Sequence, residues 1–174
     1  METRMEIPTQ TKPLSIAAPL LSVRTEVRIE RILCPVDFSP FSGRAYDYAQ
    51  SIAGQYRATL VVQHVVDLGQ HPSADFSVSA TVYEDFRAKL IADAQNDLQE
   101  FVKKYGGDSP ERIVQEGMAA EAILSLSQER SISLIVMGTH GRRGFDLLML
   151  GSVTQDVLRN ASCPVLAVCH TAPV

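Results

Sequence analysis

The chain has 174 residues, of which 45% are hydrophobic and 21% charged, and its formal net charge is −4. This length and composition are typical of one globular domain with its own hydrophobic core. The acidic balance argues against a nonspecific nucleic-acid binder, which needs a basic surface to displace counterions. No hydrophobic run reaches the length that crosses a bilayer, so the sequence predicts no membrane protein.

The first 28 residues show no hydrophobic period and contain three prolines. We interpret residues 1–28 as an N-terminal extension, partly disordered, and not as a secretion signal, because Pro13 and Pro19 interrupt its apolar stretch. The folded domain is expected over residues 29–174. Its three cysteines, Cys34, Cys163 and Cys169, lack paired metal-ligand spacing, which favours reduced structural thiols in a cytoplasmic protein over a zinc site.

From residue 29 onward, short apolar runs alternate with segments of helical period. Strands are expected at residues 32–36, 59–66, 112–115, 134–137 and 164–168. Helices are expected from Ser39-Pro40, over residues 82–102 up to Gly106-Gly107, over residues 119–126, and from Gly151-Ser152; residues 67–79 are expected to form a loop. Ser39 offers a capping hydroxyl and Pro40 suits the first helical position. The alternation predicts a single doubly wound α/β domain with a mostly parallel, five-stranded sheet and helices on both faces.

Glycines recur after the fourth expected strand, at positions 138, 141, 144 and 151. Glycine lets backbone N–H groups approach a ligand closely, and the helix that starts at Gly151-Ser152 adds free N–H donors with a partial positive charge. Arg142 and Arg143 lie in this loop, and no acidic residue occurs between Gly138 and Phe145. The segment therefore predicts a phosphate-binding loop at the carboxyl ends of the strands, where doubly wound sheets open a crevice.

Simpler interpretations stay open for several of these residues. The glycines could form turns only, since neither a Walker A loop nor a G-x-G-x-x-G fingerprint is present. Ser152 and Gln155 have capping-box spacing, so Ser152 could cap its helix instead of contacting phosphate. Asp37 could cap the helix after the first strand. His140 is expected to be a solvated loop residue, and His64 a hydrogen-bonded core histidine.

The spacing G-x-x-G, nine residues, then G-S resembles the nucleotide-binding motif of the universal stress protein family. Gly138, Gly141, Gly151 and Ser152 form it here. The first strand with its trailing Asp (I-L-C-P-V-D-F-S-P-F-S), the second strand's Q-H-V-V, and the C-terminal L-R-N-A-S-C-P-V-L-A-V also resemble that family. The resemblance covers about residues 29–170.

The resemblance implies strand order 3-2-1-4-5 and a site whose residues have separate tasks. Asp37 would meet the adenine or ribose side, with Pro35 and Val36 beside it. Val65 would line the base pocket and Met137 would contact the nucleoside. Ribose and phosphates would be surrounded by Gly138, Gly141, Gly151, Ser152 and Val153. Of the two loop arginines, Arg142 is the one we assign to phosphate.

The function implied is a stress-response regulatory protein that binds ATP, AMP or ADP, with Mg²⁺ able to enter together with the phosphates. The sequence holds no constellation that commits to catalysis, so a slow ATP hydrolase or nucleotidyl-transferring enzyme is the alternative. A third alternative is a dimeric interaction module that binds no nucleotide. The segment from Cys163 to Val168 is apolar and would form the sheet edge, which predicts a homodimer through that strand.

Overall fold

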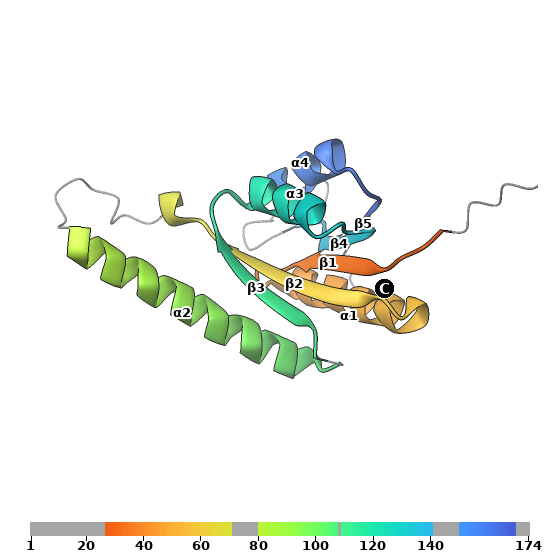
Figure 1. Cartoon of the computed structure of the whole chain (residues 1–174), viewed down its shortest axis with the longest axis horizontal. Coiled ribbons are helices and arrows are strands. Elements are labelled where there is room, and N and C mark those ends of the chain that lie inside the picture. The colour runs from red at the N-terminus through yellow and green to blue at the C-terminus, as the bar shows by residue number, and fades with distance from the viewer. Residues whose placement is uncertain (1–26, 71–79, 108, 141–149, 170–174) are drawn as a thin grey trace, which may run out of the picture.

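The computed structural model describes residues 27–70, 80–107, 109–140 and 150–169. The prediction of a partly disordered extension therefore lies almost wholly outside the described residues. The strands are β1 (Arg31–Pro35), β2 (Thr59–Val66), β3 (Glu111–Glu116), β4 (Leu134–Gly138) and β5 (Val165–Val168). The helices are α1 (Pro40–Tyr56), the short η1 (Leu68–Gln70), α2 (Ala80–Tyr105), α3 (Ala119–Glu129) and α4 (Ser152–Asn160). Figure 1 shows their arrangement.

The five strands form one parallel sheet in the order β3-β2-β1-β4-β5, which confirms both the predicted fold class and the predicted order. β1 is the central strand, and Ile32 pairs with Leu60 of β2 on one side and with Leu134 of β4 on the other. The direction of chain winding reverses between β1 and β4. The carboxyl ends of these two strands therefore flank the crevice that such a reversal creates.

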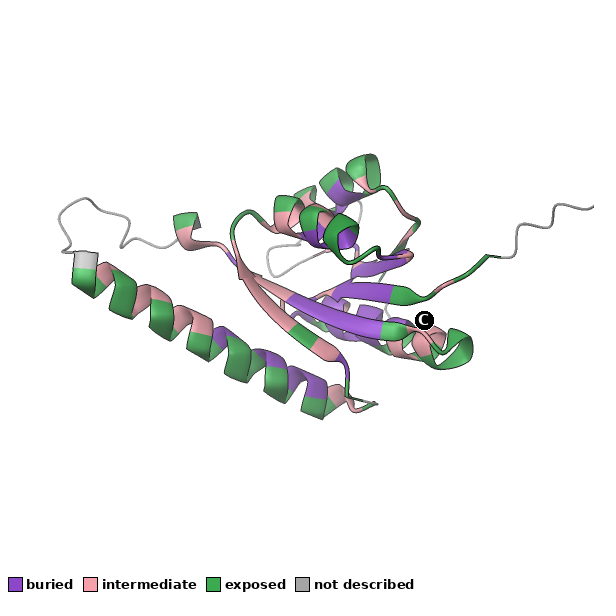
Figure 2. Ribbon diagram, viewed as in Figure 1, coloured by how far each residue is buried: buried purple, intermediate pink, exposed green. Residues whose placement is uncertain are grey.

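Two apolar clusters lie on the two faces of the sheet. α1 and α2 cover one face and α3 and α4 the other, below and above the sheet in Figure 1. β1 serves both clusters, because its successive side chains point to opposite faces: Ile32 and Cys34 enter one cluster and Leu33 the other. All three are fully buried, and the central strands are accordingly purple in Figure 2. Burial of each such side chain is worth about 1.5–3 kcal/mol.

The predicted start of α1 and the predicted end of α2 are confirmed. The hydroxyl of Ser39 caps α1 by accepting a hydrogen bond from the Ser42 N–H, and Pro40 begins the helix. α2 ends before Gly106, whose φ of +71° lies in the left-handed region that glycine tolerates best. The segment predicted as a loop after β2 begins instead with one 3₁₀ turn, Leu68–Gln70, and its residues 71–79 lie outside the described part.

The apolar stripe predicted along α2 is buried only toward the C-terminal end of the helix. Ala94, Leu98 and Val102 pack in the core, whereas Val82 is 56% exposed. Figure 1 shows the reason, since the N-terminal end of α2 projects past the sheet. Among the described helices, none combines the length and the apolar character that crossing a bilayer requires.

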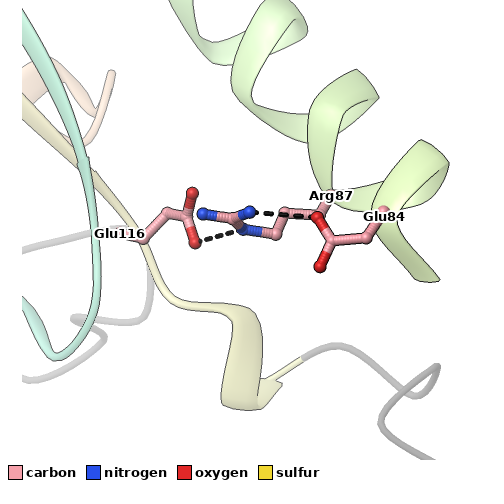
Figure 3. A network of polar contacts seen from close by, with 3 residues as sticks. All are labelled: Glu84, Arg87 and Glu116. Carbon is pink, nitrogen blue, oxygen red and sulfur yellow. Dashed lines mark hydrogen bonds and ion pairs between the residues drawn. The ribbon is translucent and has the colours of Figure 1, made fainter. Parts of the chain in front are cut away.

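An ion-pair network joins α2 to the carboxyl end of β3 (Figure 3). The Arg87 Nε donates to Glu116 Oε2 at 2.7 Å, and its Nη1 donates to Glu84 Oε2 at 3.1 Å. The Arg87 side chain is 41% exposed, so solvent screens these pairs and their contribution to stability is small. Their role is to fix the position of the projecting helix beside β3.

Candidate functional site

The strand register brings the predicted site residues of β1 and β4 together. Leu33 pairs with Ile135, and the same register carries Pro35 level with Met137 and Val36 level with Gly138. Both strands end here, so the turns after them leave from the same edge of the sheet. The structure therefore brings Asp37, which follows β1, and Gly138, which ends β4, to the same edge of the sheet.

β2 contributes Val65 to the same place. Pro35 pairs with Gln63 of β2, and Val65 lies two residues farther toward the carboxyl end. Because side chains alternate along a strand, Gln63 and Val65 point to the same face as Val61, the face covered by α3 and α4. Met137 packs on that face too. Pro35, Val65 and Met137 are therefore three apolar residues on the same face of the sheet, near the carboxyl ends of three neighbouring strands.

A tight turn holds Asp37 at the end of β1. Phe38 has φ +65°, a left-handed conformation that is uncommon for a bulky residue and typical of constrained functional turns. The Asp37 Oδ1 accepts hydrogen bonds from the Ser39 N–H at 3.1 Å and from the Ser39 hydroxyl at 2.6 Å. Asp37 is therefore not the cap of α1, as one interpretation of the sequence had it; Ser39 is the cap, and Asp37 orients it.

His64 anchors the backbone that leads into this turn. Its Nδ1 lies 2.8 Å from the Val36 carbonyl oxygen and must donate, since a carbonyl only accepts. The Val36 N–H donates to the Gln63 carbonyl at 2.8 Å, and the Phe38 ring stacks on the imidazole at a centroid distance of 4.3 Å. The prediction of a hydrogen-bonded core histidine is confirmed, and its bond fixes the peptide that precedes Asp37.

Close packing against α1 leaves no room for a side chain at Gly138. A Cβ at this position would stand 3.0 Å from the carbonyl carbon of Phe41 and 3.1 Å from its Cβ, so α1 and the end of β4 meet where a side chain would be. The buried Thr154 of α4 donates its hydroxyl to the Gly138 carbonyl at 3.0 Å. Gly138 is thus the point where β4, α1 and α4 are held together.

Gly151 is the N-cap of α4 and has no such constraint. Its φ and ψ of −60° and 148° suit any residue, and an added Cβ would lie 3.4 Å from the Thr139 carbonyl oxygen, an ordinary contact. The Gly151 N–H donates to that oxygen at 2.9 Å, which fixes the start of α4 at this edge of the sheet. Gly151 itself has no side chain with which to cap the helix.

The predicted capping box is wrong. Ser152 is the first residue of α4 and not its N-cap, and it is exposed. The Gln155 amide donates to the Leu150 carbonyl at 2.8 Å instead of closing a box. The spacing misled because glycine, which needs no hydroxyl, holds the capping position. Val153 is partly buried against the α3 and α4 cluster, while Leu158, expected on the same helical face, is 42% exposed.

Two predicted site residues, Gly141 and Arg142, lie outside the described residues, as do Arg143 and Gly144. His140 ends the described part of this loop. It is half-buried, not solvated as expected: its Nδ1 lies 2.9 Å from the Thr139 hydroxyl, and its ring lies 5.3 Å from that of Phe41. The Phe41 ring, at the start of α1, packs beside the His140 ring.

Sequence reasoning missed Gln63. This side chain is fully buried between the predicted base-pocket residues and α3, and its Nε2 donates to the Gln115 Oε1 and to the Ala122 carbonyl. The available signal was an amide inside the otherwise apolar run of β2. Buried amides need partners, and here the partners come from β3 and α3, which the sequence alone does not place beside it.

The three cysteines are free thiols, with Cys34 buried, Cys163 half-buried and Cys169 exposed. Burial and the nearby Asp47 carboxylate raise the pKa of the Cys34 thiol far above its usual range, which makes it an inert core residue. Within the part of the chain that the structure describes, no three His, Cys, Asp or Glu side chains gather as metal ligands would.

The parallel five-stranded sheet, with its order reversing between β1 and β4 and helices on both faces, defines a doubly wound α/β protein. The model of the universal stress protein family matches residues 28–168. The chain therefore belongs to the universal stress protein family, and the resemblance noted in its motifs is confirmed at this level.

Known relatives agree in sequence and in structure. Universal stress protein A homolog 1 of Coxiella burnetii is 33% identical over 142 residues, covering 80% of this chain and 95% of that protein. The solved structure of protein MJ0577 of Methanocaldococcus jannaschii is 25% identical and superimposes with a TM-score of 0.72, covering 84% of this chain and all of that one. A universal stress protein solved in complex with cAMP is 25% identical, with a TM-score of 0.53 and coverage of 82% and 98%.

Proposed function

We propose that this protein binds an adenine nucleotide, ATP or else AMP or ADP, and acts as a stress-response regulator. The observation that carries the proposal is the meeting of three features at one edge of the sheet. They are the uncapped start of α4 at Gly151, the oriented carboxylate of Asp37, and the apolar residues Pro35, Val65 and Met137. A similar protein is known in complex with cAMP, which supports an adenine ligand.

The phosphates would bind at the start of α4. The first N–H groups of any α-helix have no partner within the helix, and Gly151 supplies no side chain to satisfy them. With the helix dipole they would attract an anion, and the exposed hydroxyl of Ser152 would donate a hydrogen bond to it. Gly141, Arg142 and Val153 would complete this half of the site.

The nucleoside would occupy the other half. The apolar residues Pro35, Val65 and Met137 suit one flat face of a base, and Asp37 with the Val36 peptide suits polar atoms at its edge or on the ribose. Two hydrogen bonds to Ser39 hold the Asp37 carboxylate, and His64 holds the Val36 carbonyl. The site is therefore preorganised for binding, which lowers the entropic cost of association.

A binding role is favoured over catalysis. Mg²⁺ prefers oxygen ligands and commonly enters with phosphates, and Asp37 and Ser152 would offer it oxygen atoms here. Hydrolysis needs in addition a base that positions water. A turnover above about 1 s⁻¹, a typical enzyme rate, would favour the ATP hydrolase instead.

Isothermal titration calorimetry of the full chain with ATP, AMP and ADP tests the proposal. Gly151→Ala should fold normally but bind at least about tenfold more weakly, because each charge-assisted bond to phosphate is worth ~1.5–3 kcal/mol. Gly54→Ala is the matched control, since a Cβ at Gly54 in α1 meets nothing within 4 Å. Equal binding by both variants, or no binding by the natural chain, would contradict the proposed site.

We also propose a homodimer through β5, the edge strand of the sheet. The Pro164 carbonyl accepts a hydrogen bond from the Ile135 N–H of β4, and the Val168 carbonyl accepts one from the Thr139 N–H just after β4, at 3.0 Å each. By alternation, the peptide groups of Val165 and Ala167 point to the open edge, where Leu166 is 36% exposed. A twofold antiparallel pair centred on Leu166 would use both outward groups.

The cysteines provide a natural test of this register. Centred on Leu166, the pair would place Cys163 opposite Cys169 of the partner subunit, with Cα atoms about 5.5 Å apart and within disulfide range. Two copies of Cys169 would lie roughly 20 Å apart. Mild oxidation should therefore cross-link the natural chain, and neither Cys163→Ser nor Cys169→Ser. Cross-linking of either variant would contradict the register, and a monomer in sedimentation would contradict the dimer.

A further inference from the structure

Gln63 is the one described side chain with a buried polar atom that lacks a hydrogen-bond partner among the described residues. The residue is fully buried on β2, and its Oε1 accepts no hydrogen bond there. Its Nε2 donates to the Gln115 Oε1 at 2.5 Å and to the Ala122 carbonyl at 3.1 Å. Native proteins rarely leave such an acceptor unsatisfied, so the Oε1 calls for a partner from outside the described residues, either water or a ligand.

The orientation of this amide is fixed. The Ala122 carbonyl of α3 can only accept, so turning the amide over would place two acceptors against each other. Both Nε2 hydrogens are engaged in the observed orientation. The only hydrogen-bonding capacity that remains on Gln63 is therefore that of an acceptor, the Oε1.

Gln63 lies on the same face of the sheet as the residues proposed for the base. It pairs directly with Pro35, and the β1–β4 register continues this row to Met137. Val65 follows on the same face, and Gln115 pairs with Val65 from β3. The acceptor is therefore next to the place proposed for the base, and a base that reaches it must displace side chains that now bury it.

We infer that Gln63 selects the purine: its Oε1 accepts a hydrogen bond from the exocyclic amine of adenine and disfavours a base with an oxygen at position 6. The inference rests on the proposed nucleotide site and adds its specificity. The amine of adenine donates a hydrogen bond to the buried Gln63 Oε1. The oxo group of hypoxanthine or guanine is itself an acceptor, so the two oxygens would repel each other in a site without water. A site built around a hydrogen bond rejects an analogue that cannot make it far more strongly than an apolar pocket does.

The test compares AMP with IMP, which share ribose and phosphate and differ at position 6. Calorimetry with the full chain should show AMP binding at least about tenfold more tightly than IMP. In Gln63→Leu, the affinity for AMP should fall toward the affinity for IMP, so that the two affinities agree within about threefold. Gln128→Leu, an exposed glutamine on α3, is the matched control and should keep the natural preference.

A second measurement needs no variant and stands if Gln63→Leu does not fold. N6,N6-dimethyl-AMP has no donor at position 6 and should bind the natural chain at least about tenfold more weakly than AMP. Equal affinity for AMP and IMP, or an unchanged preference in Gln63→Leu, would overturn the role of Gln63 and leave nucleotide binding intact. Failure of every nucleotide to bind would instead overturn the proposed function itself.

Discussion

The two glycines that bracket the candidate site, Gly138 and Gly151, should respond oppositely to the same substitution. Gly138 ends β4 against the first turn of α1, and an added methyl would stand 3.0 Å from the Phe41 carbonyl carbon and 3.1 Å from its oxygen. Such a contact is tighter than nine in ten that real Cβ atoms make. Gly138→Ala should therefore require the first turn of α1 or the end of β4 to shift by a few tenths of an ångström.

The size of the effect follows from which atoms obstruct the methyl. Inserting one methyl into a packed core costs typically ~1–3 kcal/mol. Because the Phe41 backbone cannot rotate aside as a side-chain end can, we expect the upper part of that range, about 2–3 kcal/mol. For a domain of this size this lowers the melting temperature by roughly 4–12 °C. Gly151→Ala meets only a 3.4 Å contact at ordinary φ, so its stability should change by less than about 1 kcal/mol.

Urea denaturation and differential scanning calorimetry of both variants beside the natural chain measure these differences. Equal m-values, the slopes of the unfolding free energy against urea concentration, would show that the compactness of the folded and unfolded states is unchanged. If Gly138→Ala unfolds within about 0.5 kcal/mol of the natural chain, the close packing on Phe41 does not limit that position. If Gly151→Ala loses more stability than Gly138→Ala, the assignment of packing to one glycine and of ligand approach to the other is wrong.

Three further perturbations test the packing around the site. Ser39→Ala removes the N-cap of α1 and should cost ~1 kcal/mol in urea denaturation, whereas an unchanged midpoint would refute the capping role. Burial raises the pKa of the Cys34 thiol well above its usual range and that of Tyr46 to about 12. The folded chain thus keeps protons that the unfolded chain releases, so stability should fall from about pH 9 to pH 12. Cys34→Ala with Tyr46→Phe should flatten this fall, and an unchanged slope would exclude these groups as its source. Arg87→Met should cost less than about 1 kcal/mol and reduce the salt dependence of stability, since its ion pairs are exposed; a larger loss would indicate a buried role.

Much of the fold could be predicted from local patterns. The run T-L-V-V-Q-H-V-V is apolar on both faces, and β2 occupies residues Thr59–Val66 as expected. Ser39 and Pro40 signalled the start of α1, and Gly106-Gly107 signalled the end of α2. These signals are readable because capping and strand burial depend on residues close together in the chain.

The predictions that were wrong concern residues whose local structure depends on contacts with segments far away in the chain. Ser152 and Gln155 have the spacing of a capping box, yet α4 starts one residue earlier because the Gly151 N–H binds the Thr139 carbonyl. His140 looked like a solvated loop histidine until α1 placed Phe41 beside it. Spacing within one segment carries no information about such neighbours.

The sequence by itself determined the order of strands and helices, the identity of the family, and the segments that carry the candidate site, since periodicity, capping and motif spacing are local properties of the chain. Only the tertiary structure decided why each of those residues is needed. The packing of β4 on α1 explains why position 138 is glycine, and the pairing of β2 with β3 and its packing against α3 leave the Gln63 Oε1 without a hydrogen-bond partner among the described residues. Such reasons depend on contacts between residues far apart in the chain, and these contacts exist only once the sheet has formed.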